Sequence, residues 1–346
     1  MVKMRAAIGG SREIYMKILI RVPFAQKKID ELRAYFDEIV LDPWTKTGER
    51  FYEDKMLETL LSVKPDALIT ELDRITEKVL TGYGGLAFIG DCRASPANVD
   101  IEACTRHKIP VICTPARNAQ AVAEMLVGLL ITYFRNIIPS VQWIKDGKWT
   151  AGTTPYYLWM GNELCGKKIG FVGFGAVGKS AAKILEAFGC DISFYDPYVD
   201  AAEQNYTKCD LDAIFENSDI VSIHLPVLDS TKGMIDARLF SKMKSSAVFV
   251  NTARSAVVDE KALKRVLREK KIRGAILDVL AQEPPGDEVP DFATFDNVLL
   301  TPHICGATYE VSDHQADIIT ERIIKWFRKE DLDRIVFNKS VLQKEA

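Results

Sequence analysis

The sequence lacks the features that mark several broad classes of protein. Its 45 lysine and arginine residues are slightly outnumbered by 48 aspartate and glutamate residues, which gives a formal net charge of −3. Acidic and basic residues are mixed along the chain without a basic stripe, and this pattern argues against nucleic acid or an anionic membrane as a partner. No stretch approaches the roughly 18 apolar residues of a membrane span, and the amino-terminal segment has no apolar core of a signal peptide.

Cysteine and histidine patterns that would indicate a disulfide framework or a metal site are also missing. The 7 cysteines are scattered, none belongs to a CxxC pair, and most lie in apolar surroundings. Such cysteines are typical of free thiols in a reducing cytosol. The 4 histidines show no ligand spacing, which argues against a metal site. We therefore expect a cytoplasmic protein without a metal.

The length of 346 residues suits two domains rather than one. Apolar strand-like runs alternate with amphipathic helix-like stretches in two series, and this alternation predicts parallel sheets covered on both faces. In the first series we expect strands near 17–22, 37–41, 66–70, 86–90 and 110–113, and helices near 25–36, 50–63 and 98–107. In the second we expect strands at 167–172, 191–195, 219–224, 246–250, 273–278 and 297–300, and helices at 176–188, 210–216, 234–242 and 259–270. A long helical pattern, 119–145, interrupted near Pro139, separates the two series, and a final helix covers about 309–329.

A glycine-rich loop directly follows the first strand of the second series. The segment Gly173-Phe174-Gly175-Ala176-Val177-Gly178 lies between a strand and a helix. The first glycine permits a tight turn, the second lets the backbone approach a pyrophosphate, and the third lets the helix pack on the strand. Asp196 closes the next strand, where an acid would bind the ribose hydroxyls. This context favours dinucleotide binding over a glycine-rich turn without a ligand.

Three further polar segments each follow a strand of the second series. They are Asn251-Thr252-Ala253-Arg254, then Asp278 with Glu283 shortly after it, then Thr301-Pro302-His303. Ligands of open α/β sheets bind beyond the carboxyl ends of the strands, so an arginine, a carboxylate and a histidine are expected to converge. Taken alone, Arg254 could be a surface ion-pair residue, Glu283 a turn residue and His303 a buried structural histidine.

Together these side chains suit the oxidation of a hydroxy acid. The planar fork of arginine can hold a carboxylate and a neighbouring carbonyl oxygen. Histidine can exchange the hydroxyl proton near neutral pH, and a carboxylate bonded to it favours its protonated form. His224, which also ends a strand, is interpreted either as a residue lining the adenosine side or as a structural residue.

From about residue 17 to 340 the chain resembles the D-isomer-specific 2-hydroxyacid dehydrogenases, which include phosphoglycerate, glycerate and D-lactate dehydrogenases. The motifs that carry the resemblance are Gly-Phe-Val-Gly-Phe-Gly-Ala-Val-Gly at 170–178, His-Leu-Pro at 224–226, Asn-Thr-Ala-Arg at 251–254, Leu-Asp-Val-Leu at 277–280, Glu-Pro-Pro at 283–285 and Thr-Pro-His at 301–303. The resemblance implies an α/β fold of two doubly wound parallel-sheet domains, with a Rossmann nucleotide-binding domain inserted into a flavodoxin-like substrate domain. The expected boundaries are 1–115 and 308–346 for the substrate domain and 116–307 for the NAD-binding domain.

The resemblance also implies the site residues. Arg254, Glu283 and His303 would be the catalytic trio, and Asp278 would face the nicotinamide amide. Further expected cofactor-binding residues are Gly173, Gly175, Ala176, Val177, Gly178, Asp196, Leu225, Thr252, Ala253, Arg254, Asp278, His303 and Gly306. The cofactor would be NAD rather than NADP, because Asp196 would repel a 2′-phosphate and no neighbouring arginine offsets that repulsion.

The expected substrate contacts are Arg93, Ala94 and Ser95, together with Arg254. Family members usually place glycines where this chain has Ala94 and Ser95, so that backbone amides can hold the substrate carboxylate. Arg117 is either a second positive group near the substrate or a solvated loop residue. Glu71 and Asp73 replace part of an arginine–serine–x–threonine run, and an acid pair there argues against phosphoglycerate because it would repel a phosphate.

The loop 149–163 is rich in aromatic residues, which suit either stacking on a sugar-like substrate or a subunit contact. By resemblance, a homodimer is expected through the segment 119–147 and this loop. The function we expect is NAD-dependent interconversion of a small D-2-hydroxy acid, such as a sugar acid or a glycerate-like compound, and its 2-keto acid. A nucleotide-sensing scaffold or corepressor on the same fold is the alternative. Formate dehydrogenase is set aside because that branch has glutamine in place of Glu283.

Overall fold

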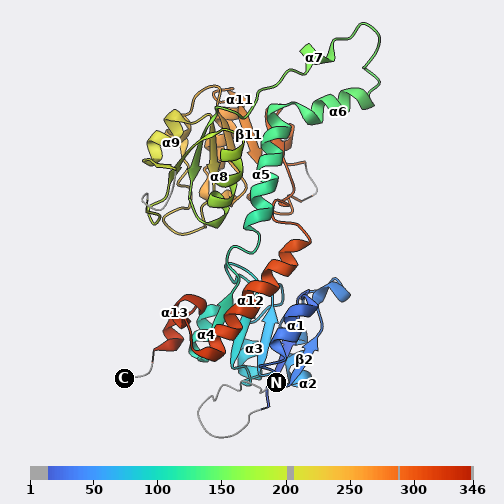
Figure 1. Ribbon diagram of the computed structural model, residues 1–346, viewed down its shortest axis with the longest axis vertical. Helices are drawn as coiled ribbons and strands as arrows, with labels where there is room; N and C mark the ends of the chain where they lie inside the picture. The colour runs from blue at the N-terminus through green and yellow to red at the C-terminus, as the bar shows by residue number, and fades with distance from the viewer. Residues whose placement is uncertain (1–14, 201–205, 287–288, 344–346) are drawn as a thin grey trace. The chain divides into compact units, whose positions relative to one another are not determined.

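The computed structural model describes residues 15–200, 206–286 and 289–343, and the chain divides into two compact units. Unit 1 comprises Met1–Arg117 and Thr308–Ala346, and unit 2 comprises Asn118–Ala307. Unit 2 is therefore inserted between two segments of unit 1, as the colours of the ribbon show (Figure 1).

Unit 1 is built on a five-stranded parallel sheet with the order β2-β1-β3-β4-β5. This is the flavodoxin-like order of a doubly wound sheet. The strands are β1 (Lys17–Ile20), β2 (Glu38–Leu41), β3 (Ala67–Thr70), β4 (Phe88–Asp91) and β5 (Val111–Cys113). The helices are α1 (Gln26–Leu32), α2 (Glu53–Val63), α3 (Glu77–Gly82), α4 (Ile101–Arg106), α12 (Glu310–Arg328) and α13 (Leu332–Ile335), with 3-10 turns at Trp44–Lys46 and Lys339–Leu342.

Apolar runs in the central strands of unit 1 bury both faces of its sheet. On one face Leu19, Leu68 and Ile89 pack with residues of α2 to α4. On the other face Ile18 and Phe88 pack with α1 and with α12, which returns to unit 1 at the end of the chain. Each fully buried aliphatic or aromatic side chain contributes roughly 1.5–3 kcal/mol to folding. The sheet thus forms a rigid layer, and its polar residues lie at the carboxyl ends of the strands.

Unit 2 is built on a seven-stranded parallel sheet with the order β12-β11-β10-β9-β6-β7-β8. Numbered within the unit, the order 3-2-1-4-5-6 is that of the Rossmann fold, with one further strand at the β12 edge. The strands are β6 (Lys168–Val172), β7 (Asp191–Tyr195), β8 (Thr207–Lys208), β9 (Ile220–Ile223), β10 (Val248–Asn251), β11 (Gly274–Leu277) and β12 (Val298–Leu300). The helices are α5 (Ala119–Phe134), α6 (Ile137–Lys145), α7 (Pro155–Leu158), α8 (Ala176–Ala187), α9 (Leu211–Asn217), α10 (Ala237–Phe240) and α11 (Glu260–Arg268), with 3-10 turns at Ser255–Val257 and Asp291–Thr294.

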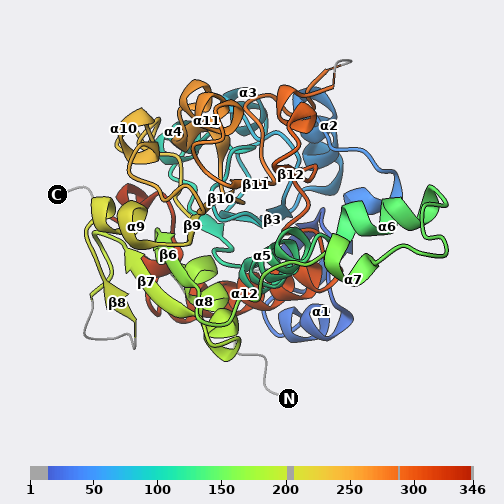
Figure 2. The ribbon, with the colours of Figure 1, turned by 90° about the horizontal axis from the view of Figure 1, so that it is seen from above.

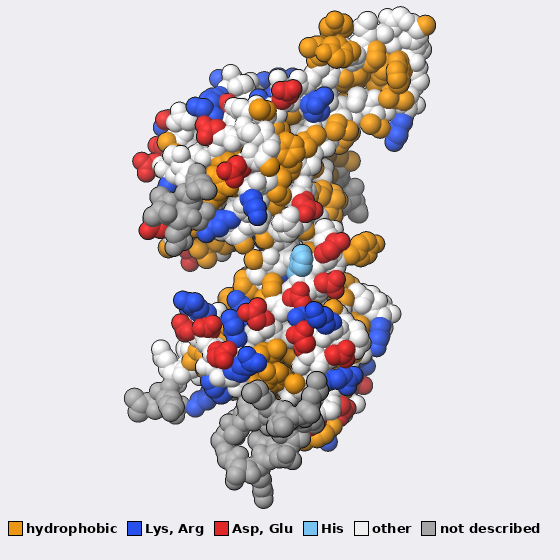
Figure 3. Space-filling view, viewed as in Figure 1, with side chains coloured by type: hydrophobic (Ala, Val, Ile, Leu, Met, Phe, Trp, Pro, Cys, Tyr) orange, Lys and Arg blue, Asp and Glu red, His pale blue; other side chains and the backbone are white. Residues whose placement is uncertain are grey.

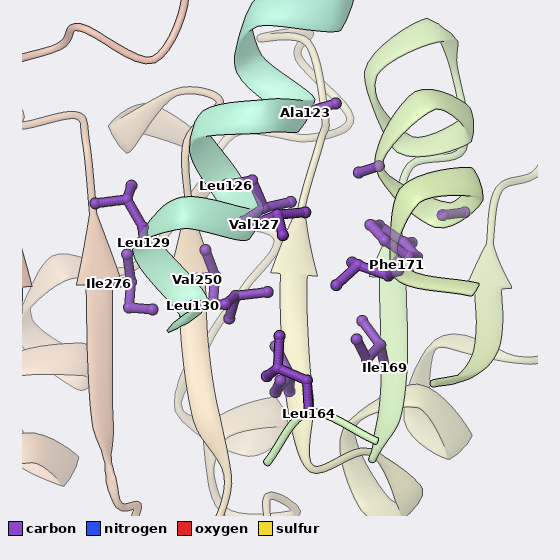
Figure 4. Packing of buried hydrophobic residues seen from close by; sticks show 14 of the residues in the cluster. Ala123, Leu126, Val127, Leu129, Leu130, Leu164, Ile169, Phe171, Val250 and Ile276 are labelled. Carbon is purple, nitrogen blue, oxygen red and sulfur yellow. The ribbon is translucent and has the colours of Figure 1, made fainter. Parts of the chain in front are cut away.

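The long helix α5 is a core element of unit 2. It packs beside α8, and its apolar side chains lie against one face of the sheet (Figures 2 and 4). Leu126, Leu130 and their neighbours contact buried side chains of β6, β10 and β11, among them Phe171 and Ile276. Among the described residues no single helix could cross a membrane. Together α5 and α6 have the length and apolar composition of a span, but the two helices are bent by 61° relative to each other.

The structure corrects several details of the sequence prediction. The break in the 119–145 helix lies at Asn136, whose φ is +52°, and not at Pro139. Pro139 lies in the first turn of α6, where its missing N–H would have had no helical partner. The edge strand β8 was not expected, and neither were the short helices α3, α7 and α13. These elements are only 2 to 6 residues long, which is too short for a clear periodic pattern.

Candidate active site

The glycine loop of unit 2 has the geometry that a dinucleotide requires. Gly173 has φ +90°, and a Cβ there would lie 2.6 Å from the His224 carbonyl oxygen. A Cβ on Gly178 would lie 2.9 Å from the Gly173 carbonyl oxygen, whereas a Cβ on Gly175 would point into open space. Gly175 is the N-cap of α8, with Ala176 and Val177 in the first turn. The loop therefore leaves a cradle above helical N–H groups, and that cradle fits a pyrophosphate.

Asp196 follows β7 and lies beside this cradle. Its Oδ2 accepts a hydrogen bond from the Phe174 N–H at 2.8 Å, and its Oδ1 accepts one from the Tyr198 N–H at 2.8 Å. The carboxylate is thus fixed against the glycine loop. In this position it can also accept hydrogen bonds from ribose hydroxyls.

The remaining expected cofactor residues of unit 2 follow β9, β10 and β12. Leu225 is buried and its side chain packs against Gly173. Thr252 is buried as well, and its Oγ1 has no hydrogen-bond partner. At Gly306 a Cβ would lie 2.5 Å from the Asn118 side chain. An orphaned hydroxyl and a cradle that a side chain would fill are both consistent with a bound dinucleotide.

His224 has a structural environment. Its Nε2 lies 2.8 Å from the Ser222 Oγ, and its ring packs against Phe171 with centroids 5.4 Å apart. Burial lowers the pKa of His224 to about 4. The ring is therefore neutral at physiological pH, and the structural interpretation of this residue is the one that the contacts support.

His303 and Glu283 form a hydrogen-bonded pair. The Nδ1 atom of His303 lies 2.5 Å from the Glu283 Oε2. The Oε1 atom of Glu283 accepts a hydrogen bond from the Leu280 N–H at 2.7 Å. Because the Nδ1 side of the ring is bonded to Glu283, the Nε2 atom remains for a substrate. The imidazole is 45% exposed, so a substrate can reach it.

Asp278 holds the turn that carries His303. The carboxylate of this buried residue accepts hydrogen bonds from the Thr301 hydroxyl at 2.5 Å and from the N–H groups of Ile304 and Cys305 at 2.9 Å each. These donors bracket His303, whose φ is +56°, a conformation that costs energy for a residue other than glycine. Sequence reasoning expected Asp278 at the nicotinamide and missed this positioning role, because the bonds join residues more than 20 positions apart.

Arg254 ends the turn after β10. The Asn251 side chain accepts a hydrogen bond from the Ala253 N–H and donates one to the Arg254 carbonyl oxygen, which fixes the turn. The Arg254 side chain is exposed, and its NH1 donates to the Ala253 carbonyl oxygen at 2.6 Å. The structure therefore joins Glu283 and His303 directly. It places Arg254 in the turn after β10 of the same sheet, without a hydrogen bond to either of them.

A pocket of about 460 Å³ opens beside the hydrogen-bonded pair His303 and Glu283. Glu283, His303 and Asp278 form its polar wall. Its apolar wall consists of Leu280, Pro284, Pro285, Pro290, Leu300 and Pro302, and Thr301 completes the lining. A cavity of this size with a few convergent polar groups is typical of small-molecule sites.

The expected substrate loop belongs to unit 1, where it follows β4. Ala94 and Ser95 are exposed at its tip, and the Arg93 NH1 donates to the Glu71 carbonyl oxygen at 3.4 Å. The Arg93 carbonyl oxygen accepts a hydrogen bond from the Thr114 N–H at 2.9 Å. Because β3, β4 and β5 are parallel neighbours, their carboxyl ends place this loop beside the turns that follow β3 and β5.

The acids that follow β3 are both paired with arginine. Asp73 is buried and bonds to the buried Arg21 at 3.2 Å. Glu71 pairs with Arg117 at 2.8 Å and accepts a hydrogen bond from the Trp44 indole at 3.2 Å. Arg117 is thus an ion-pair residue and not a solvated one. The sequence suggested that Glu71 and Asp73 would repel a phosphate. That argument treated both acids as unpaired, and the ion pairs with Arg117 and Arg21 show that they are paired.

Comparison with known proteins identifies the family. Residues 127–305 match the family described as D-isomer specific 2-hydroxyacid dehydrogenase, NAD binding domain. The chain is 43% identical over 330 residues to YoaD of Bacillus subtilis, a protein assigned by its name to the 2-hydroxyacid dehydrogenases, with 95% of this chain and 96% of that protein covered. It is 38% identical over 283 residues to the glyoxylate reductase of Thermofilum pendens, with 80% and 83% covered.

The fold is similar to a solved structure of an NADPH-dependent glyoxylate/hydroxypyruvate reductase from Sinorhizobium meliloti. The two share 25% identity with a TM-score of 0.72, over 90% of this chain and 95% of that one. These findings confirm the expected fold class of two parallel α/β sheets with a Rossmann domain, the expected cofactor class and the expected enzyme class. The chain belongs to the D-isomer specific 2-hydroxyacid dehydrogenase family and is an NAD-dependent oxidoreductase.

Proposed function

We propose that the chain interconverts a small D-2-hydroxy acid and its 2-keto acid, with His303 as the general acid–base, Glu283 as its partner and Arg254 as the clamp on the substrate. The observation that carries this proposal is the 2.5 Å contact between the His303 Nδ1 and the Glu283 Oε2 at the wall of the 460 Å³ pocket. A histidine oriented by a carboxylate and exposed to a small-molecule pocket suits proton exchange with a hydroxyl or carbonyl oxygen.

The chain's own residues perform the proton transfer. For reduction, the imidazolium of His303 gives its Nε2 proton to the keto oxygen of the substrate. For oxidation, the neutral ring accepts the hydroxyl proton at the same atom. Glu283 stays ionised and is held by the Leu280 N–H, so it stabilises the charged ring without taking the proton. Bound nicotinamide cofactor supplies or accepts the hydride at the carbinol carbon.

Arg254 orients the substrate in this scheme. Its guanidinium offers paired N–H donors to the substrate carboxylate and the adjoining oxygen. It would leave its present contact with the Ala253 carbonyl oxygen to do so. We further propose that Arg93, Ala94 and Ser95 contact the substrate, because backbone N–H groups at the exposed loop tip suit a carboxylate.

We propose a glycerate-like hydroxy acid or a sugar acid as the substrate class. Relatives of the chain are named glyoxylate reductase and glyoxylate/hydroxypyruvate reductase, and these names describe small 2-keto acids. The experiment is a steady-state assay of the purified chain with NADH and a panel of glyoxylate, hydroxypyruvate, longer sugar-derived 2-keto acids and phosphohydroxypyruvate. Turnover of at least one unphosphorylated acid is expected. Binding of NADH without turnover of any panel member would instead favour a nucleotide-sensing scaffold.

We propose that the enzyme prefers NAD to NADP. The carboxylate of Asp196 is held beside the glycine loop, and its neighbours Tyr195, Pro197 and Tyr198 carry no positive charge. A carboxylate accepts hydrogen bonds from ribose hydroxyls but repels a phosphate. The NADPH dependence of the Sinorhizobium meliloti reductase makes this a property to test on this chain.

We propose that the chain is a homodimer joined through α6 and the loop 149–163. The first part of the expected interface segment 119–147, helix α5, is buried in the core of unit 2 and is therefore not part of the proposed interface. Nine large apolar side chains of α6 and the loop 149–163 are exposed, and they form the projecting apolar surface of unit 2 (Figure 3). They are Ile137, Ile138, Val141, Ile144, Trp149, Tyr156, Tyr157, Leu158 and Met160. Clusters of this kind are typical of interfaces and uncommon on monomers.

Light scattering tests the dimer. Ile144→Asp is expected to shift the mass from dimer toward monomer, whereas the matched change Leu61→Asp on α2, at a side chain of similar exposure, should leave the mass unchanged. A monomeric wild type at micromolar concentration contradicts the proposal.

A further inference from the structure

The substrate loop, residues 92–97, is closed at its base by two buried polar side chains. Asp91 precedes the loop and Asn98 follows it, and both side chains are buried. The Asn98 Nδ2 donates to the Asp91 Oδ1 at 3.1 Å and to the Asp73 carbonyl oxygen at 3.1 Å. A single carboxamide thus ties the loop after β4 to the loop after β3.

Two oxygen atoms of this pair have no partner. The Asp91 Oδ2 and the Asn98 Oδ1 are buried and receive no hydrogen bond. Two buried acceptors without a donor are costly, because each buried unsatisfied acceptor carries a desolvation penalty. A proton on the Asp91 Oδ2 removes the conflict, since that oxygen becomes a donor and the Asn98 Oδ1 is the free acceptor on the same carboxamide. The acid and the amide then form a cyclic pair with two hydrogen bonds.

The charged surroundings of Asp91 are compatible with a neutral carboxyl. Burial raises the pKa of Asp91 to about 7, against the opposing effects of the Asn98 hydrogen bond and the charges of Arg93 and Arg117, and Glu71 raises it further. Cys92 and Cys113 are buried neighbours whose thiols burial also keeps protonated. From α12, Arg322 is bonded to the Cys113 carbonyl oxygen and the uncharged Gln315 to Arg117. Arg93 and Arg117 are bonded to the Glu71 carbonyl oxygen and carboxylate, and neither is hydrogen-bonded to the Asp91 Oδ2.

We infer that Asp91 and Asn98 are positioning residues that hold the substrate loop in its binding geometry, and that they do so while Asp91 is protonated. The inference rests on the proposed contact of Arg93, Ala94 and Ser95 with the substrate. Loss of the Asp91 proton breaks one of the two hydrogen bonds and brings a negative charge to the base of a loop that binds an anion. Both effects weaken substrate binding as the pH rises, and neither acts on the cofactor site in unit 2.

Asp91→Asn is the decisive variant because asparagine reproduces the neutral acid at every pH. Its carboxamide can accept from the Asn98 Nδ2 and donate to the Asn98 Oδ1. We expect the wild-type KM for the keto acid to rise about tenfold from pH 6 to pH 8.5, the usual effect of losing one buried hydrogen bond. The Asp91→Asn enzyme should keep a low KM across this range, so the ratio of the two KM values isolates Asp91 from the titration of His303. Asp100→Asn, at the N-cap of α4 on the far side of Asn98, is the matched control and should follow the wild type.

Two further measurements separate this inference from the proposed function. Arg93→Ala tests whether the loop binds substrate, and an unchanged KM in that variant would refute the substrate assignment and, with it, the inference. If Arg93→Ala raises KM but Asp91→Asn has the same pH dependence as the wild type, the loop assignment stands and the proposed role of Asp91 and Asn98 is refuted. Infrared difference spectra between pH 6 and pH 8.5 detect a protonated carboxyl without any turnover. We expect a band that Asp91→Asn abolishes, together with an unchanged Kd for NADH, and the absence of that band would refute a protonated Asp91.

Discussion

Replacing Glu283 by glutamine is the sharpest test of how the site handles the proton. In the wild type the Glu283 Oε1 accepts from the Leu280 N–H and the Oε2 faces the His303 Nδ1. Glutamine has only one acceptor oxygen. If that oxygen keeps the Leu280 bond, the NH2 group faces Nδ1 and favours the neutral ring, in which Nδ1 is an acceptor. The variant therefore disfavours the imidazolium both by losing a charge and by reversing a hydrogen bond.

The expected size of the effect follows from the geometry. A hydrogen bond to a charged group contributes about 1.5–3 kcal/mol, and one pH unit corresponds to about 1.4 kcal/mol. The two side chains are 45% and 35% exposed, so solvent screening favours the lower end of that range. Reduction needs the protonated ring and therefore declines as the pH rises. The high-pH limb of kcat/KM for reduction should move to lower pH by about one unit in Glu283→Gln.

The assay is the pH dependence of NADH consumption in the wild type, Glu283→Gln and Glu269→Gln. Glu269 is exposed at the end of α11, just before the amino end of β11, whereas the site lies at the carboxyl ends of the strands. Its variant therefore makes the same chemical change away from the chemistry. His303→Ala should lose roughly 10²–10⁴-fold in turnover, the usual contribution of a positioned acid–base group. An unshifted limb in Glu283→Gln, or near-normal turnover in His303→Ala, would show that the proton comes from another group.

Three other perturbations address the clamp, the cofactor and the stability of unit 2. Arg254→Lys should lower kcat/KM for the keto acid about 10–100-fold, because lysine cannot reproduce the paired donors. A fluorescence titration should show an unchanged Kd for NADH in this variant. A change in KM without a change in kcat would assign Arg254 to substrate binding only. The wild type should have a higher kcat/KM with NADH than with NADPH, and Asp196→Ser should narrow that ratio; equal efficiency in the wild type would contradict the role of Asp196. Burial lowers the pKa of His224 from 6.5 to about 4, so between these pH values the unfolded chain binds one more proton than the folded chain. The free energy of unfolding should therefore decline as the pH falls from 6.5 to about 4, by at most about 3 kcal/mol. Denaturant unfolding of His224→Gln should show a flatter decline with pH, and parallel declines in the two proteins would contradict this prediction.

Features that depend on neighbouring residues in the chain could be predicted from the sequence. Every strand that the apolar runs indicated is present. Most of the central strands are fully buried, as continuous hydrophobic runs in a parallel sheet predict. The glycine loop could also be predicted from neighbouring residues. Gly173 has a positive φ, and Gly178 closely approaches the Gly173 carbonyl oxygen. The order of motifs after successive strands then placed Arg254, Glu283 and His303 at the carboxyl ends of the strands of one sheet.

Features that depend on pairing between distant residues could not be predicted. Glu71 and Asp73 are separated by one residue and were interpreted as a single acidic feature, yet each bonds to a different arginine, Arg117 and Arg21. The sequence contains both arginines but no pattern that connects them to these acids. The exposed edge strand β8 likewise has no apolar pattern, and only its pairing with β7 defines it.

The buried acids Asp91 and Asp278, each at a strand end, have related roles, and the positioning role of neither could be recognised from the sequence. Asp278 in unit 2 receives the donors that bracket His303, and Asp91 in unit 1 is tied to the far end of the loop that carries Ala94 and Ser95. In each case the exposed, chemically useful group sits on an irregular turn that has few bonds of its own, and the buried carboxyl at its base supplies them. A buried acid without such bonds would destabilise its unit. A substitution that removes these hydrogen bonds, such as Asp278→Ala or Asp91→Ala, should therefore impair catalysis through a displaced neighbour, and the KM and pH profiles distinguish that outcome from simple unfolding.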